Sequence, residues 1–156
     1  MAVLNEEQTM LKDQAEAWVK EVAPVRAFRT LRDSGSNKGW DPAVWSAMVD
    51  MGWTGIVVPE ALGGSDLGYL TFGVLLEQTG RELTASPLLA SALIGASALR
   101  LGGSDAQQRD WLPGVVDGST VLTLAVDESN RHAPARTAMK AEKTGDGFKL
   151  TGTKTL

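Results

Sequence analysis

The spacing of apolar and polar residues predicts an amphipathic helix near the N-terminus. Five apolar residues recur on one face of it: Leu4, Leu11, Ala15, Trp18 and Val22. Asn5 precedes the helix as a candidate N-cap, and Glu6 and Glu7 lie where carboxylates stabilise the positive end of the helix dipole. Pro24 then marks a break or the first turn of a second short helix.

Further start and stop signals predict more helices along the first three quarters of the chain. Asp41-Pro42 is typical of a helix start, and Gly52 of the end of that helix. Ser104 and Gln107 form the pattern of a capping box before a helix over residues 105–116. Between these two helices a third shows helical spacing of Tyr69, Phe72, Leu76 and Leu83.

The most apolar stretch, residues 86–103, reads SPLLASALIGASALRLGG. It is apolar nearly all round, so we expect a helix enclosed by other helices. Its serines and an arginine keep it below the ~18 to 20 uninterrupted apolar residues of a membrane span. One face is built of small residues around one larger one, which favours close approach of a neighbouring helix or, as the alternative, of a long apolar ligand: Ala90, Ser91, Ile94, Gly95 and Ala98.

From Gly118 the pattern changes to that of β-strands. Residues 119–126, 137–143 and 148–154 are β-rich or alternate, and Gly145 to Gly147 suits a hairpin turn. We therefore predict an α+β protein, with an all-α helical bundle over residues 1–117 and the first antiparallel strands of a barrel-like β-domain over residues 118–156. Two or three strands seldom stand alone, so we expect the chain to be a truncated piece of a longer protein.

The glycine-rich segment GWTGIVVPEALGGSDLG, residues 52–68, invites comparison with phosphate-binding loops. It matches neither G-x-x-x-x-G-K-[ST] nor G-x-G-x-x-G. We interpret it as a compact connection whose glycines allow unusual backbone angles while Ile56, Val57 and Val58 enter the core.

Composition and charge narrow the classes of function. A net charge of -4 without basic runs argues against binding to nucleic acid or a membrane. Cysteine is absent and the N-terminus is acidic where a targeting signal is basic, so we expect a cytoplasmic protein. His132 is the only histidine, and no pattern of metal ligands accompanies it. The acids whose titration we expect to be perturbed are Glu60, Glu77, Asp127 and Glu128.

Four ordered motifs resemble the acyl-CoA dehydrogenase superfamily. They are MGWTGIVVPEALGG, LLEQTGREL, DAQQRDWLPGVVDGSTVLTLAVDE and AEKTGDGFKLTGTK, and together they cover about residues 40–154. The resemblance implies an N-terminal helical domain, a middle β-domain and a C-terminal bundle, with FAD between them and an acyl-CoA beside the flavin. It also implies an electron-transfer flavoprotein or similar acceptor, and a homo- or hetero-oligomer. The catalytic base belongs to the C-terminal bundle in this family, so we expect no catalytic residue among residues 1–156.

The chain departs from the family where the flavin loop is expected. Relatives carry Thr-Glu-Pro-x-x-Gly-Ser-Asp, whereas this chain reads AVDESNRHAPAR from residue 125. By the resemblance we expect the cofactor near Leu124, Val126 and Asp127. We expect the substrate near four residues of the apolar helix and the following loop: Ser91, Ile94, Gly95 and His132.

Several functions stay open at this point. An active dehydrogenase with an altered flavin loop is the leading hypothesis, and a non-catalytic partner subunit with a degraded flavin site is the second. A flavin monooxygenase or oxidase of the same superfamily and a plain helical interaction module are the others. The acyl group, whether linear, branched or steroid-like, is not specified by the sequence.

Overall fold

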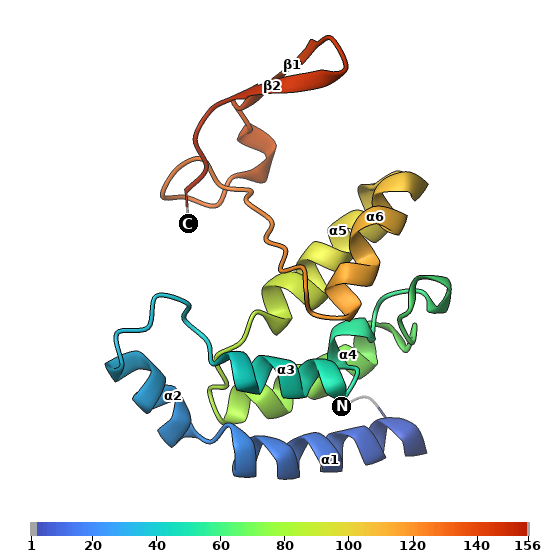
Figure 1. Cartoon of the computed structure of the whole chain (residues 1–156), viewed down its shortest axis with the longest axis vertical. Helices are drawn as coiled ribbons and strands as arrows, with labels where there is room; N and C mark the ends of the chain where they lie inside the picture. The colour runs from blue at the N-terminus through green and yellow to red at the C-terminus, as the bar shows by residue number, and fades with distance from the viewer. Residues whose placement is uncertain (1–2, 156) are drawn as a thin grey trace. The chain divides into compact units, whose positions relative to one another are not determined.

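The computed structural model describes residues 3–155 in two compact units (Figure 1). The first unit runs to Thr123 and is helical, and the second begins at Leu124 and contains two antiparallel strands. This order confirms the predicted α+β class with helices before strands. The boundary that we expected after residue 117 stays a prediction.

The first helix, α1 (Glu6–Val22), begins at Asn5 as expected. Asn5 Oδ1 accepts the Gln8 N–H at 2.8 Å, and Gln8 Oε1 accepts the Asn5 N–H at 3.2 Å, which completes a capping box. The helix packs along α4 (Gly68–Arg81), where Gln8 Nε2 donates to Thr71 Oγ1 at 3.2 Å. Its buried face includes Ala15 and Val19.

Two of the residues expected on the buried face of α4 lie elsewhere. Phe72 is buried, but Tyr69 is half exposed at 51%. Leu83 follows the end of α4 with a φ of 54°, so it lies outside the helix, and its side chain is exposed. Apolar spacing predicted Leu83 as a helical residue because sequence alone does not show the left-handed turn that ends the helix.

Two short helices precede the glycine-rich segment. After Pro24, α2 (Val25–Asp33) follows, and none of its residues is fully buried. The next helix, α3 (Pro42–Asp50), is capped by Asp41, whose Oδ1 accepts the Ala43 N–H at 2.8 Å. Gly52 ends this region in the left-handed conformation, with a φ of 72°. The predicted start and stop signals of α3 are confirmed.

The glycine-rich segment enters the core with residues 53–58 and returns to the surface after them. It contains two 3₁₀ turns, η1 (Trp53–Gly55) and η2 (Glu60–Leu62). Ile56, Val57 and Val58 are buried as predicted. Thr54 is also fully buried, and its hydroxyl donates to the Val116 carbonyl at 2.6 Å, which joins this segment to the end of α6 (Asp105–Val116).

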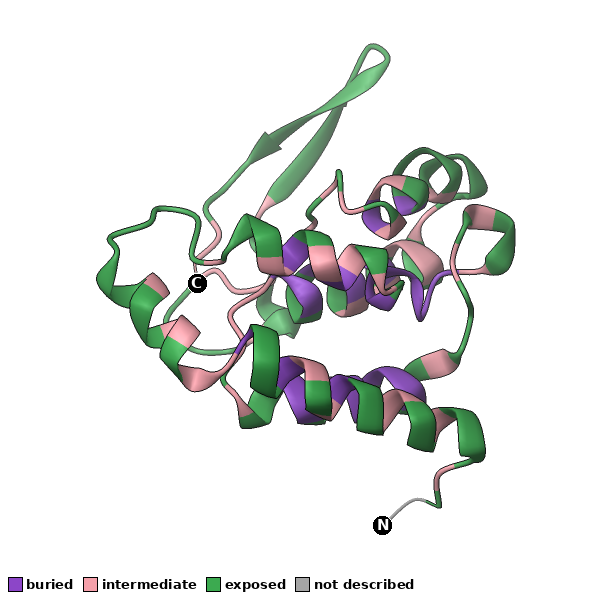
Figure 2. Ribbon diagram, turned by 60° about the horizontal axis from the view of Figure 1, so that its bottom comes forward, coloured by how far each residue is buried: buried purple, intermediate pink, exposed green. Residues whose placement is uncertain are grey.

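The core of the first unit lies where α1, α3 and α4 meet the glycine-rich segment. Buried residues gather on the inward sides of these helices (Figure 2). Trp18 and Trp53 meet edge to face, with ring centroids 4.9 Å apart and planes at 72°. The buried set also includes Met48, Phe72, Leu75, Leu88 and Leu112.

The apolar stretch forms a π-helix, η3 (Leu88–Gly95), that continues into α5 (Ala96–Gly102). The expectation of complete enclosure is wrong for the first unit as described. Leu88, Ser91, Ala92, Gly95 and Ala96 are buried, whereas the opposite face is exposed, including Leu89, Ile94 and Leu101 at 50%, 40% and 83%. Composition predicted a helix enclosed on all sides because both of its faces are equally apolar. The fold decides which of the two faces is buried.

Residues 119–126, which we expected to form a strand, are extended without pairing to another strand. The N–H groups of Thr120 and Leu122 bond to helices instead. The Thr120 N–H donates to the Gly114 carbonyl at 2.8 Å, and the Leu122 N–H donates to Ser91 Oγ at 3.0 Å. Trp45 Nε1 donates to the Gly118 carbonyl at 3.2 Å and fixes the start of this segment. The β-rich composition of this run suits an extended backbone, but helices supply the hydrogen-bond partners of Thr120 and Leu122.

The second unit contains the predicted hairpin. Strand β1 (Lys140–Thr144) pairs antiparallel with β2 (Gly147–Thr151), with Lys140 opposite Thr151 and Thr144 opposite Gly147. A 3₁₀ turn, η4 (Pro134–Arg136), precedes it. All residues of both strands are exposed. Among residues 3–155, no helix combines the length and apolarity that crossing a bilayer requires.

Candidate functional site

The first candidate site lies on η3, where the sequence predicted a substrate-binding face. The structure gives Ser91 and Gly95 contacts within the chain. Ser91 Oγ accepts the Leu122 N–H, and a Cβ added at Gly95 would lie 2.5 Å from Leu122 Cβ. Both residues are buried beneath this extended segment. Their contact with a substrate stays a prediction.

Ile94 belongs to the other, exposed face of η3. It is 40% exposed, and Leu89, Ala90 and Ala98 are exposed with it. Residues 87–99 carry no charged side chain. This face therefore offers apolar area, flanked by small residues, that an apolar ligand or another protein segment could cover.

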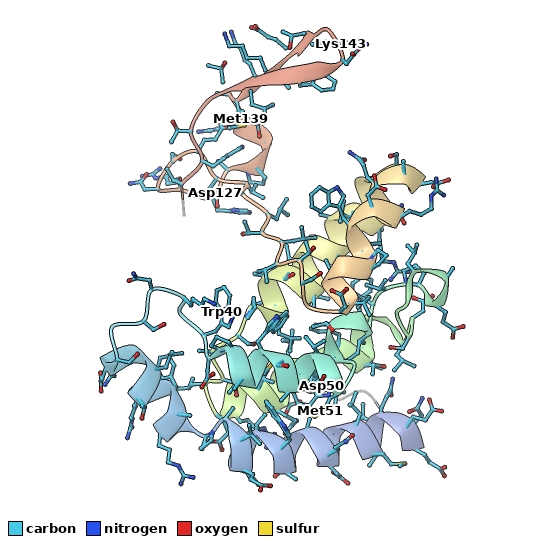
Figure 3. All side chains as sticks on the ribbon, in the orientation of Figure 1. Trp40, Asp50, Met51, Asp127, Met139 and Lys143 are labelled. Carbon is cyan, nitrogen blue, oxygen red and sulfur yellow. The ribbon has the colours of Figure 1, made fainter. Side chains whose placement is uncertain are left out.

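The second candidate site is the loop that follows residue 124 in the second unit. Asp127 is labelled there in Figure 3. Its two carboxylate oxygens lie 3.1 and 3.2 Å from His132 Nδ1, and Oδ1 also accepts the Ala133 N–H at 3.2 Å. The hydrogen bond from His132 is the main cause that lowers the pKa of Asp127, so this carboxyl is ionised at neutral pH.

The neighbouring acid, Glu128, forms hydrogen bonds with a different set of groups. It accepts the Ala138 and Met139 N–H groups at 2.6 and 3.0 Å and Lys154 Nζ at 2.8 Å. Lys154 also donates to the Val126 carbonyl at 3.1 Å. The bonds to Glu128 lower its pKa to about 2. The hydrogen bond from Lys154 is the largest cause, and the two bonds from backbone N–H groups are the next largest.

The role of Lys154 was missed by sequence reasoning. It lies 26 residues after Glu128, and nothing in the spacing links the two. The remaining acids flagged from sequence are on exposed surface of the first unit. Glu60 begins η2, and Glu77 pairs with Arg81 one helical turn away at 2.7 Å. Within the described range, no group of three or more potential metal ligands gathers.

The residues of the loop fit a flavin only through their main chain. Within residues 3–155, the N–H groups of Leu124 and Val126 donate no hydrogen bond, so they can bond a flavin edge. At position 127 the side chain is a carboxylate, and it is already held by His132. A carboxylate at that edge opposes the negative charge that reduction places on a flavin.

A cleft in the first unit was not predicted from sequence. It has a volume of about 540 Å³ and lies between α2 and the ends of α1 and α3. The residues lining it include Val22, Arg26, Phe28, Leu31, Val44 and Thr84. The apolar residues of α2 face it, which explains why none of them reaches full burial.

Comparisons with a family model and with curated proteins lead to the same family. The family model described as "Acyl-CoA dehydrogenase, N-terminal domain" matches residues 5–119. The protein named Acyl-CoA dehydrogenase FadE27, from Mycobacterium tuberculosis, is 35% identical over 116 residues, which cover 74% of this chain and 30% of the relative.

Two solved structures are similar over nearly the whole chain. One is described as the Tcur3481-Tcur3483 steroid ACAD G363A variant, with a TM-score of 0.84, 37% identity, and coverage of 96% of this chain and 40% of that one. The other is the ChsE4-ChsE5 complex from Mycobacterium tuberculosis, with a TM-score of 0.83, 30% identity, and coverage of 99% and 41%. The chain thus spans less than half of the length of these proteins.

Proposed function

The chain belongs to the acyl-CoA dehydrogenase family, and from this premise we propose that it is part of an FAD-dependent enzyme that introduces an α,β double bond into an acyl-CoA thioester. The match of the family's N-terminal domain to residues 5–119 carries the proposal. Because the chain spans 30% of the curated relative, the activity of the whole protein is the proposal and not a property of these residues alone.

FAD, when bound, supplies the acceptor for the hydride that leaves the β-carbon of the acyl group. In this proposal the N–H groups of Leu124 and Val126 would hold the flavin edge. The base that removes the α-proton would come from the C-terminal bundle that the family resemblance implies. An electron-transfer flavoprotein or similar acceptor would then reoxidise the cofactor.

The exposed face of η3 would contact the acyl group. Ile94 and its small neighbours present apolar area without charge, which suits an alkyl or ring system. A relative that is 37% identical is described as a steroid ACAD. This similarity favours a bulky fused-ring acyl group over a linear one.

A second candidate function is that of a partner subunit that completes the site of another chain without holding its own flavin. The specific observation is the Asp127 carboxylate, which stands where the family has a hydroxyl and is engaged by His132 and Ala133. The description of one similar structure as a complex of two differently named proteins, ChsE4 and ChsE5, supports this alternative.

Purification and co-expression test both candidates. If the whole encoded protein is an active dehydrogenase, it is yellow when purified alone and bleaches anaerobically with an acyl-CoA. If it is a partner subunit, flavin is retained only when a related chain is co-expressed. Colourless protein in both preparations would contradict both proposals.

A further inference from the structure

The contact between Asp127 and His132 fixes where the proton of the imidazole lies. An ionised carboxylate can only accept hydrogen bonds, and both oxygens of Asp127 face Nδ1 at 3.1 and 3.2 Å. Nδ1 must therefore carry a hydrogen. In the neutral ring, the lone pair is then on Nε2, and the carboxylate sets this tautomer.

The His132 ring is largely exposed to solvent, and Nε2 makes no hydrogen bond within residues 3–155. The His132 side chain is 72% exposed, whereas Asp127 is 31% exposed and is anchored by the Ala133 N–H. Two other charged groups belong to the surroundings of the pair. Lys154 acts on Asp127, and the oxygens of Glu128, the next residue in the chain, are taken by other donors. Arg131 precedes His132 and makes no ion pair in the described part of the chain.

We propose that Asp127 and His132 form a proton-accepting site, in which Asp127 positions the ring and Nε2 takes a proton from a ligand that presents an O–H or S–H group. The arrangement of carboxylate, imidazole and free Nε2 is the one that general bases use. The proposal goes beyond the function argued above, because it requires neither a flavin nor a thioester.

The proton transfer is balanced without a further reactant. The O–H or S–H bond of the ligand breaks, and its electron pair stays on the ligand atom. A new N–H bond forms at Nε2, and Nδ1 stays hydrogen-bonded to the Asp127 carboxylate until the ring returns the proton to water. Nothing is oxidised or reduced.

Nitrogen NMR tests the tautomer directly, because His132 is the only histidine in the sequence and gives one set of ring signals. At a pH where the ring is neutral, we expect the Nδ1–H form to dominate in the ¹⁵N-labelled chain. Asp127→Ala should shift the population towards Nε2–H, and Asp127→Asn, which keeps an acceptor oxygen, should shift it less. Glu142→Gln, in the exposed strand β1, is the matched control and should leave the tautomer unchanged.

Acylation of the ring by diethyl pyrocarbonate gives a second measurement, since this reagent attacks an unprotonated ring nitrogen. We expect His132 to react several-fold faster in the unmodified chain than in Asp127→Ala, and equally fast in Glu142→Gln. A dominant Nε2–H tautomer in the unmodified chain would overturn the proposal whatever the variants do. Equal reaction rates with and without Asp127 would overturn it as well. Both readouts are independent of flavin and of acyl-CoA, so their failure is distinct from that of the proposed dehydrogenase.

Discussion

Leu122 lies directly over Gly95, so that the extended segment after α6 covers the buried face of η3, which carries Ser91 and Gly95. A Cβ built at Gly95 would be 2.5 Å from Leu122 Cβ and 3.3 Å from the Ala90 carbonyl oxygen. Because Leu122 Cβ is attached to the main chain, a rotamer change does not relieve this contact. The glycine at position 95 is therefore required by the path of residues 120–122.

Gly95→Ala should lower the free energy of unfolding by about 1 to 3 kcal/mol, the range observed for overpacked cores. The added methyl must push the Leu122 main chain away from η3, and this outweighs the gain in helix propensity. Urea unfolding of the chain, followed by tryptophan fluorescence, measures the change.

Gly73→Ala is the matched control for that variant. Gly73 lies inside α4 and is exposed, and a Cβ added there would meet no atom within 4 Å. Alanine there should raise stability by about 0.5 to 1 kcal/mol, because it restricts the unfolded chain and favours helix. If both glycines respond alike, the packing of Leu122 on Gly95 does not decide the result.

Two serines on the same helical stretch should respond differently to alanine. Ser91 Oγ accepts the Leu122 N–H at 3.0 Å, whereas the buried Ser97 Oγ has no partner within residues 3–155. Ser91→Ala should cost about 1 to 2 kcal/mol, because a backbone donor loses its acceptor. Ser97→Ala should be neutral or stabilising. Thermal unfolding of the two variants side by side provides the comparison, and an equal loss would contradict it.

Gln78 is fully buried in α4, and neither its amide nitrogen nor its oxygen bonds to another described residue. Gln78→Leu keeps a similar shape and removes the unpaired polar group. We expect the free energy of unfolding to rise by about 1 to 2 kcal/mol, because the desolvation cost of the amide disappears. A clear loss of stability, measured by urea unfolding, would show instead that the amide has a polar partner such as an internal water.

Acid should destabilise the fold of the second unit by protonating Glu128. The bonds from Lys154, Ala138 and Met139 lower the pKa of Glu128 from its ordinary value of 4.5 to about 2. A lowered folded pKa stabilises the fold above the unfolded value, so this contribution is complete above pH 4.5 and is lost as the pH falls towards about 2.

NMR shifts of the Glu128 carboxyl carbon and the Met139 amide should report this transition together. Glu128→Gln should abolish the change at Met139. Glu142→Gln, in the exposed strand β1, is the control and should leave it intact. A Glu128 titration near its ordinary value, with Met139 unaffected, would contradict the prediction.

Local signals in the sequence predicted the elements that local chemistry fixes. The caps at Asn5, Asp41 and Ser104 define helix starts because their side chains bond to N–H groups two or three residues away. The hairpin followed from alternation and a glycine turn. The burial of Val57 and Val58 followed from an apolar run between glycines.

Features that depend on distant partners could not be predicted in the same way. The segment around Leu122 has the β-rich composition of a strand, but Ser91, 31 residues earlier, decides where the Leu122 N–H group bonds. Lys154 reaches Glu128 across 26 residues. In the loop after Leu124, the sequence placed a carboxylate at Asp127, but it did not show that His132 holds this carboxylate.

Gly64 illustrates how tightly the glycine-rich segment is folded on itself. A Cβ there would overlap the Val58 carbonyl group, whereas at Gly68 it would meet nothing within 4 Å. In a saturation library of this chain, position 64 should therefore reject every substitution, while position 68 should still accept asparagine or aspartate, which tolerate its positive φ. Among related sequences we therefore expect glycine to be kept at position 64 and to vary at position 68, although the two glycines look equivalent in this sequence.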